Sequence, residues 1–263
     1  MSTANPAYDW SAAQYLKFKD ERTQPARDLS ARVSLQSPKR LVDLGCGPGN
    51  STVVLESRYP DALLVGMDSS PDMIRQAKSI LPHLKFSIAD LNTYTPEAPI
   101  DLYYSNAVFQ WLGRKERIGV IKRLIGIKPT GGVFAFQVPD NLNEPSHVLM
   151  RETFKTGPWA AKLQSVGRDT FQSLQEIHKQ LKPLYSEVSL FHTSYYHSLE
   201  NHEAIIEWVK GTGLRPYVDL LQPEEKDAFL KEYLRRLKET YPSSVDGRVL
   251  LRYPRLFVVT VKS

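Results

Sequence analysis

Cysteine is nearly absent from this sequence. The 263 residues contain one, Cys46, so the chain can form neither an internal disulfide nor a cysteine-based metal cluster. A chain without disulfides suits a reducing compartment, and we expect a cytoplasmic location. The six histidines are scattered, and neither an H-E-x-x-H motif nor a cysteine pair occurs. We therefore expect no metal site.

Long apolar runs and blocks of like charge are also missing. No run approaches the ~20 residues that span a bilayer, and the N-terminal MSTANPAYDW lacks the basic region and apolar core of a signal peptide. The net charge is +5, from 34 basic and 29 acidic residues, with no lysine or arginine cluster. This dispersed excess favours a small anionic substrate. We expect no nucleic-acid or membrane partner, and a monomer or weak oligomer.

Between Arg40 and Val138, short apolar segments alternate with segments of helical periodicity. The expected strands are 40–45, 62–68, 84–90, 100–106 and 131–138. The expected helices are 50–59, 70–81 and 114–127, the second with Ser70 as N-cap and Pro71 at its first position. Continuously apolar strands separated by helices predict a parallel sheet that is covered on both faces.

Three glycines follow the first expected strand, as Gly45-x-Gly47-x-Gly49 in LVDLGCGPGNSTVVL. A dinucleotide fingerprint requires G-x-G-x-x-G, because a pyrophosphate binds at the helix N-terminus, and here Asn50 holds the third glycine's position. The pattern disfavours a nicotinamide dehydrogenase. It favours a ligand that lies along the turn, pressed against bare backbone.

Polar residues lie at the carboxyl ends of successive expected strands. They are Asp43, Asp68, Asp90, Asn106 and Asp140. Ligands of open α/β sheets bind outside the carboxyl ends of the strands, so we expect these residues to line the site. Asp68 follows Gly47 by 21 residues, and a carboxylate there can accept both hydroxyls of a ribose.

These motifs resemble those of class I S-adenosylmethionine-dependent methyltransferases. VDLGCGPG is similar to the first motif of that family, Asp68 to its second-strand acid, and Ala89-Asp90, YSNAVFQWL and LKPTGGVFAFQV to the segments that follow. The resemblance implies S-adenosylmethionine as cofactor. The cofactor-binding residues that it implies are Arg22, Asp43, Gly45, Gly47, Asn50, Asp68, Ser69, Ala89, Asp90 and Asn106.

Segments outside the cofactor motifs narrow the resemblance to one family of methyltransferases. VPDNLNEPSHVLMRE, TSYYHSL, AIIEWVKGTGLRP and YPRLFVV are similar to the trans-aconitate 2-methyltransferase family, whereas the likeness is faint between about Thr153 and Pro183. The resemblance implies transfer of a methyl group to one carboxylate of a small polycarboxylic acid, and the acid we expect is trans-aconitate. The products would be a monomethyl ester and S-adenosylhomocysteine.

The expected fold class is α/β: a Rossmann-like, doubly wound, mostly parallel seven-stranded sheet with an added helical substrate lobe. We expect a single domain over 1–263. Its expected parts are an N-terminal helical cap (1–38, with a break at Pro25), the cofactor-binding core (39–140), a helical lobe and late strand forming the substrate site (141–248), and a terminal strand region (249–263, broken at Pro254).

A carboxylate is already ionised at pH 7, so it needs no general base. Catalysis then consists of in-line positioning and exclusion of water, while arginine is suited to bind the remaining carboxylates through two parallel hydrogen bonds. The expected substrate-binding residues are Arg215, Arg255, Tyr195, Tyr196 and His147; on a strand, the two tyrosines would face opposite ways. The residues expected beside the transferred methyl are Gln110, Trp111 and His147.

Two other functions stay open. A methyltransferase could act on a carrier-bound acid, which calls for a basic docking face, or on a small-molecule hydroxyl, which calls for a base such as His147 or His197. A non-catalytic module would bind S-adenosylmethionine without turnover.

Overall fold

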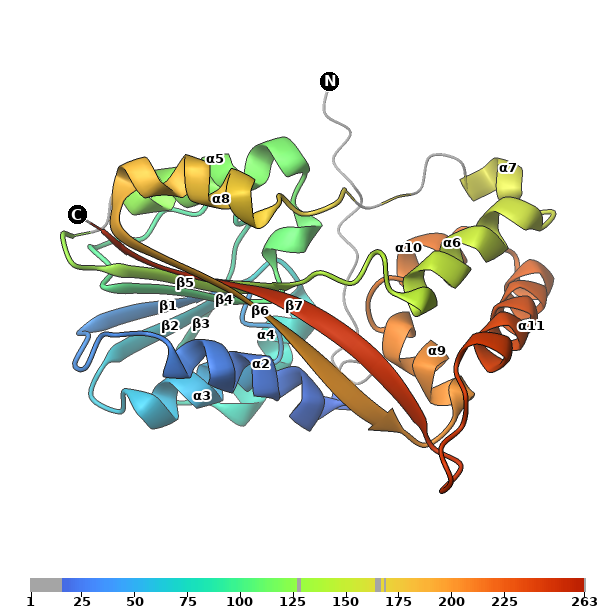
Figure 1. Ribbon diagram of the computed structural model, residues 1–263. Helices are drawn as coiled ribbons and strands as arrows, with labels where there is room; N and C mark the ends of the chain where they lie inside the picture. Colours follow the sequence, from blue (N-terminus) through green and yellow to red (C-terminus); the bar gives the residue numbers. More distant parts are fainter. Residues whose placement is uncertain (1–15, 127–128, 164–166, 168, 263) are drawn as a thin grey trace. The chain divides into compact units, whose positions relative to one another are not determined.

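The computed structural model describes residues 16–126, 129–163, 167 and 169–262 and divides into two compact units (Figure 1). The first unit comprises Met1–Pro139, Asp169–His192 and Leu256–Ser263, and the second comprises Asp140–Arg168 and Thr193–Arg255. Two long strands, β6 (Tyr185–Leu199) and β7 (Val249–Lys262), contribute residues to both units.

The strands form a seven-stranded sheet in the order β3-β2-β1-β4-β5-β7-β6. The other strands are β1 (Arg40–Leu44), β2 (Leu63–Asp68), β3 (Lys85–Ile88), β4 (Leu102–Asn106) and β5 (Val133–Pro139). Strands β1 to β5 are parallel, and Val42 of β1, for example, pairs with Val65 of β2 and Tyr103 of β4. The predicted α/β fold with a mostly parallel seven-stranded sheet is confirmed.

Strand β7 runs antiparallel to β5. The Lys262 amide donates to the Gly132 carbonyl near one end, and the Asp140 amide donates to the Pro254 carbonyl at 2.9 Å near the other. The predicted break at Pro254 is wrong, because β7 continues through this residue. The fixed φ of proline is compatible with extended chain, and Pro254 loses only its amide donor while its carbonyl keeps its partner.

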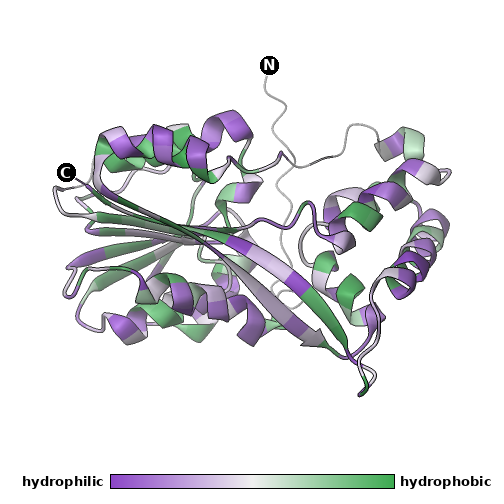
Figure 2. Ribbon diagram, viewed as in Figure 1, coloured by the Kyte–Doolittle hydropathy of each residue, from purple (hydrophilic) through white to green (hydrophobic). Residues whose placement is uncertain are grey.

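Helices cover both faces of the sheet in the first unit (Figure 1). Helices α2 (Lys19–Ala31), α3 (Asn50–Arg58) and α4 (Pro71–Ile80) lie over one face, and α5 (Arg114–Gly126) and α8 (Leu174–Leu181) lie over the other. Hydrophobic residues run along the strands, whereas these helices carry hydrophilic residues as well (Figure 2). As predicted, Ser70 caps α4: its hydroxyl accepts the Met73 amide at 3.3 Å.

Helix α2 is continuous, so the predicted break at Pro25 is also wrong. A proline inside a helix removes one backbone hydrogen bond, which costs roughly 3 kcal/mol in isolation. Ala26 and Leu29 of the same helix are fully buried, and the burial of a leucine side chain stabilises by about 1.5–3 kcal/mol. Tertiary packing therefore outweighs the local signal.

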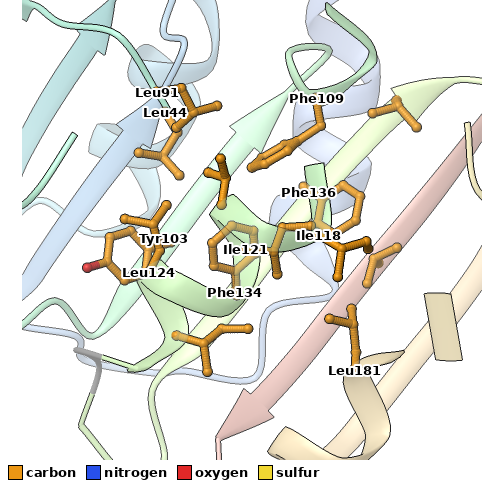
Figure 3. Close-up of a cluster of buried hydrophobic side chains, with 14 of the residues drawn as sticks. Leu44, Leu91, Tyr103, Phe109, Ile118, Ile121, Leu124, Phe134, Phe136 and Leu181 are labelled. Atoms are coloured by element: carbon orange, nitrogen blue, oxygen red, sulfur yellow. The ribbon is translucent and has the colours of Figure 1, made fainter. Parts of the chain in front are cut away.

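The core between the sheet and α5 is rich in aromatic residues (Figure 3). Phe109 lies 5.2 Å from Phe136 and 5.9 Å from Phe134 between ring centroids, and all three side chains are fully buried. Ile118 and Ile121 of α5 belong to the same cluster. Because Phe109 begins the short 3₁₀ helix η1 (Phe109–Trp111), this core also anchors the segment that follows β4.

The second unit is mainly helical. Its helices are α6 (Pro145–Thr156), α7 (Ala160–Leu163), α9 (His202–Lys210), α10 (Arg215–Val218) and α11 (Pro223–Thr240). Stacked rings join three of them: Phe154 lies 3.7 Å from Tyr217 and 4.5 Å from Phe229 between centroids. Among the described residues of both units, no helix is both long and apolar enough to cross a membrane.

Candidate active site

The glycine turn after β1 is open on the side where a ligand would lie. Gly45, Gly47 and Gly49 all have positive φ, at +70°, +55° and +97°. A Cβ on Gly45 would lie 2.3 Å from a methyl carbon of Val108, so packing requires glycine there. A Cβ on Gly47 would meet nothing within 4 Å. Gly47 therefore borders free space that a ligand can enter.

Asp68, at the end of β2, holds this turn in place. Its Oδ2 accepts the Gly47 amide at 3.0 Å, and its Oδ1 accepts the Ser70 amide at 2.9 Å. Because each carboxylate oxygen can accept two hydrogen bonds, the Asp68 carboxylate can still accept a hydroxyl donor beside its backbone donors. Burial raises the pKa of Asp68, and the backbone hydrogen bonds partly offset this rise.

Asp43, in β1, is completely buried. Its Oδ2 accepts hydroxyl hydrogens from Ser51 and Thr52, both at 2.7 Å. Desolvation raises the pKa of Asp43 to about 6, and the two hydroxyl donors act against this rise. Asp43 thus changes charge in a range where most carboxylates stay ionised.

Two buried acceptors near the turn have no donor within the described part of the protein. They are Oδ1 of Asp43 and Oδ1 of Asn50. Asn50 is itself fixed, because its Nδ2 donates to Oγ1 of Thr23 in α2 at 3.0 Å. A ligand with N–H donors would satisfy both acceptors, and S-adenosylmethionine carries an ammonium group. The residues at the turn therefore fit this cofactor.

The remaining predicted cofactor residues of β2 and β3 lie at the same edge of the sheet. The Ala89 amide donates to the Asp68 carbonyl at 3.0 Å, so the ends of β2 and β3 are adjacent. Ser69 and Asp90 are exposed, and Asp90 accepts the Asn92 amide at 2.9 Å. Arg22 of α2 is buried, next to Thr23, the residue that holds Asn50.

The segment after β4 begins with a strained residue that the sequence did not reveal. Ala107 has φ +61°, a left-handed conformation unusual for alanine. Gln137 of β5 holds it, because its carbonyl accepts the Ala107 amide at 2.9 Å and its Nε2 donates to Oδ1 of Asn106 at 2.6 Å. The sequence feature that could have indicated this contact is Gln137 itself, a polar residue inside an otherwise apolar strand. Asn106 is thus oriented by Gln137.

Two of the three residues predicted beside the methyl, Gln110 and Trp111, differ in exposure. Gln110 is buried, and its Nε2 donates to the Ala107 carbonyl at 2.6 Å. Within the described ranges, its Oε1 has no hydrogen-bond partner. The neighbouring Trp111 keeps 37% of its surface exposed.

In the second unit, Arg255 is buried among aromatic rings. Only 4% of its surface is exposed, and its guanidinium carbon lies 4.9 Å from the ring centroid of Tyr253 and 6.0 Å from that of Tyr195. The ring of His197 lies 4.5 Å from that of Trp208 in the same cluster. The structure thus brings Arg255 and Tyr195 together, as the substrate hypothesis requires.

The other predicted substrate residues have different surroundings. Tyr196 is 63% exposed, whereas Tyr195 is half-buried, in keeping with the opposite directions of neighbouring strand residues. Arg215 forms an ion pair with Asp219, with Nε 3.1 Å from Oδ2. His147 is buried, and its Nε2 and Nδ1 lie 3.2 Å from Asn141 Nδ2 and 3.3 Å from Ser146 Oγ.

Comparisons with known proteins show which family the chain belongs to. The model of the methyltransferase domain family matches residues 41–132. A trans-aconitate 2-methyltransferase of Rhizobium rhizogenes (strain K84) is 49% identical over 255 residues, which is 96% of this chain and 99% of that protein.

Two solved structures share the fold. The YcgJ protein of Bacillus subtilis has a TM-score of 0.57 at 11% identity, covering 91% of this chain and 98% of its own. Mycolic acid cyclopropane synthase CmaA1, solved with SAH, has a TM-score of 0.55 at 12% identity, covering 97% and 91%.

The open glycine turn, Asp68 and the matched domain define an S-adenosylmethionine-dependent methyltransferase. The similarity to the Rhizobium rhizogenes protein extends over nearly the full length of both chains. It therefore identifies the family more specifically than the match to the domain model does. On that basis the chain belongs to the trans-aconitate 2-methyltransferase family, and the predicted resemblance is confirmed.

We expect Asp68→Ala to weaken S-adenosylmethionine binding at least tenfold, because hydrogen bonds to a charged group contribute roughly 1.5–3 kcal/mol each. Asp68→Asn, which keeps one acceptor oxygen, should fall between the alanine variant and the wild type. Isothermal titration measures the dissociation constants. Asp72→Ala, in the first turn of α4, is the control. Unchanged affinity in both Asp68 variants would remove this residue from the site.

The raised pKa of Asp43 predicts a pH-dependent stability. The folded protein keeps this proton up to about pH 6, whereas the ordinary pKa of a free aspartate side chain is 3.8. Ionised Asp43 therefore opposes folding, and this effect is absent below about pH 4, grows as the pH rises to about 6, and is complete above it. We expect the unfolding free energy of Asp43→Asn minus that of wild type to increase over this range by on the order of 3 kcal/mol.

Urea unfolding between pH 4 and pH 8 measures this difference. The double variant Ser51→Ala/Thr52→Val removes the two donors that lower the pKa of Asp43, so its pH-dependent range should move upward. A difference between Asp43→Asn and wild type that stays constant across the range contradicts the prediction.

Proposed function

We propose that this enzyme transfers a methyl group from S-adenosylmethionine to one carboxylate of trans-aconitate, giving a monomethyl ester and S-adenosylhomocysteine. The observation that carries the proposal is the buried Arg255, whose guanidinium lies near the rings of both Tyr195 and Tyr253. The name of the Rhizobium rhizogenes relative supports the choice of acid.

Arg255 is the best-suited residue for anion binding among the predicted ones. A guanidinium stays ionised at every physiological pH and presents a planar set of donors that matches a carboxylate. Because Arg255 is buried, a carboxylate that reached it would interact in a medium less polar than water. Arg215 already pairs with Asp219, so we assign it a secondary role.

The aromatic neighbours of Arg255 hold its guanidinium plane. The rings of Tyr253 and Tyr195 lie within about 6 Å, a distance at which the faces of aromatic rings attract cations. Tyr195 also has a hydroxyl, which can donate a hydrogen bond to an acid. We propose that Tyr195 and Arg255 bind the carboxylates of the substrate together.

The cofactor would supply an activated methyl group on a positively charged sulfur. The protein's own part is to orient and to exclude water. We propose that Asp68 binds the ribose hydroxyls, that Asp43 and Asn50 accept from the ammonium group, and that Gln110 and Trp111 border the acceptor. No proton has to be removed from a carboxylate at pH 7, so the reaction needs no general base.

The surroundings of His147 and His197 support a hydroxyl acceptor less well than a carboxylate acceptor. A hydroxyl acceptor calls for a base within hydrogen-bond reach. Both ring nitrogens of His147 already lie near Asn141 and Ser146, and His197 is buried in the aromatic cluster with Trp208.

We keep the cytoplasm as the proposed location, since the only cysteine, Cys46, is free and buried. A monomer or weak oligomer remains the proposed state.

A panel of di- and tricarboxylic acids with labelled S-adenosylmethionine tests the proposal. We expect trans-aconitate to give a product heavier by one methyl group, at rates that differ less than about twofold between pH 7 and pH 8, because the acceptor is ionised throughout. Mass spectrometry identifies the ester. Cofactor binding without any ester would favour a non-catalytic module. A steep loss of rate from pH 8 to pH 7 would favour a hydroxyl acceptor.

We expect Arg255→Met to raise the KM for the acid at least 30-fold, as the loss of a buried charged partner costs ~2–5 kcal/mol. The affinity for S-adenosylmethionine should change less than threefold. Arg248→Met, just before β7, is the control, because Arg248 is exposed and binds Ser198. Steady-state kinetics of both variants measure the KM for the acid. An unchanged KM in Arg255→Met would exclude Arg255 from the anion site.

A further inference from the structure

Arg117 of α5 is a charged residue in an apolar place. It lies four and seven residues before Ile121 and Leu124, on the helix face that packs into the core, and its side chain is fully buried. A buried charge is expensive unless its hydrogen-bonding groups are satisfied. The position of Arg117 therefore calls for a specific set of partners.

Among the residues that the structure describes, its guanidinium donates to four backbone carbonyls of two separate segments. Nε donates to Leu112 at 2.9 Å, and Nη2 to Gln110 at 3.4 Å. From the other segment, Nη1 donates to Thr170 at 2.8 Å and Nη2 to Asp169 at 3.2 Å. One side chain thus ties residues 110–112, which follow β4, to residues 169–170.

The ring of Phe171 completes these surroundings. The guanidinium carbon of Arg117 lies 4.7 Å from the Phe171 centroid, and Phe171 lies 6.2 Å from Phe136. Phe136 in turn contacts Phe109, the first residue of η1 (Figure 3). The polar and apolar contacts therefore converge on the same short segment, Phe109–Leu112.

A second arginine, Arg114, binds residues 169–171 to the start of α5. Arg114 donates through Nη1 to the carbonyls of Thr170 and Phe171 at 3.0 and 3.1 Å, and its amide donates to Asp169 Oδ2 at 3.0 Å. Its Nη2 also pairs with Glu176 of α8 at 2.8 Å. Residues 169–171 are thereby hydrogen-bonded to the start of α5, so Arg117 connects η1 to a segment that Arg114 also anchors.

We propose that Arg117 is a positioning residue for methyl transfer, holding the backbone on both sides of Trp111 so that Gln110 and Trp111 keep their orientation. The proposal rests on the proposed function, in which these two residues border the acceptor. It also gives a role to residues 169–171, which lie in the stretch where the family resemblance was faint. Lysine cannot replace Arg117, because a single ammonium cannot reach four carbonyls in two segments.

The decisive experiment compares Arg117→Lys with Arg123→Lys. Arg123 is a matched control on the same helix, since it also donates to backbone carbonyls, those of Leu91, Asn92 and Tyr94 in the loop after β3. We expect Arg117→Lys to lower kcat 10- to 100-fold, the order of loss that a misplacement of about 1 Å can cause, with S-adenosylmethionine affinity within threefold. Arg123→Lys should keep kcat within threefold.

A spectroscopic measurement separates positioning from general loss of stability. Protein labelled with 5-fluorotryptophan gives a ¹⁹F signal for Trp111, assigned through Trp111→Phe. We expect this signal to shift or broaden in Arg117→Lys and to stay unchanged in Arg123→Lys. An unchanged signal, a kcat within twofold of wild type, or an equal loss of kcat in both lysine variants would overturn the proposal.

Phe171→Leu is the second variant if Arg117→Lys does not fold. It removes the ring face and leaves the four hydrogen-bonding carbonyls in place, so we expect a three- to tenfold loss of kcat and a shifted Trp111 signal. Wild-type kinetics and an unchanged signal would contradict the proposal. If the wild type methylated no acid, the proposed function would fail, whereas the ¹⁹F comparison would still report whether Arg117 positions Trp111.

Discussion

The pair of backbone hydrogen bonds to Asp68 is the interaction on which the cofactor site depends. One carboxylate accepts the amide of Gly47, in the turn after β1, and the amide of Ser70, at the start of α4. It thereby fixes the turn relative to β2 and its helix. Because Gly47 has no neighbour where a side chain would be, the turn is held without being covered. Rigid support and open space are both needed to bind a ligand along the backbone.

The same physical arrangement recurs after β4. Gln137 holds the strained Ala107 and its neighbour Asn106 through one hydrogen bond each, and Arg117 holds the next turn through two of its hydrogen bonds, to Gln110 and Leu112. Buried polar side chains such as these add little to net stability. They make one backbone conformation much better than its alternatives, because any other would leave their donors unsatisfied. A reaction that depends on positioning rather than on a base needs this kind of specificity.

The sequence predicted best what is decided locally. The Ser70-Pro71 cap follows from the requirements of a helix start, and the parallel strands follow from their apolar character. The two predicted breaks, at Pro25 and Pro254, were wrong because non-local contacts decide there. The local preference of proline is real, but tertiary packing outweighs it at Pro25, and the hydrogen bond that the Pro254 carbonyl keeps outweighs it at Pro254.

Partners that are distant in the sequence could not be predicted in the same way. Gln137 holds Asn106, Arg117 holds Thr170, and Arg255 lies near Tyr195, and no pattern in one sequence links these positions. The detectable sign was local: a glutamine in an apolar strand and an arginine on an apolar helix face each implied a buried polar contact. Such a sign identifies the residue without identifying its partner.

The most direct test of the central claim is a crystal structure of the protein with S-adenosylhomocysteine. We expect density along Gly45 to Gly49, with the ribose hydroxyls within about 3 Å of the Asp68 carboxylate, the usual hydrogen-bonding distance. Density at any other place, or a ribose that does not contact Asp68, would contradict it.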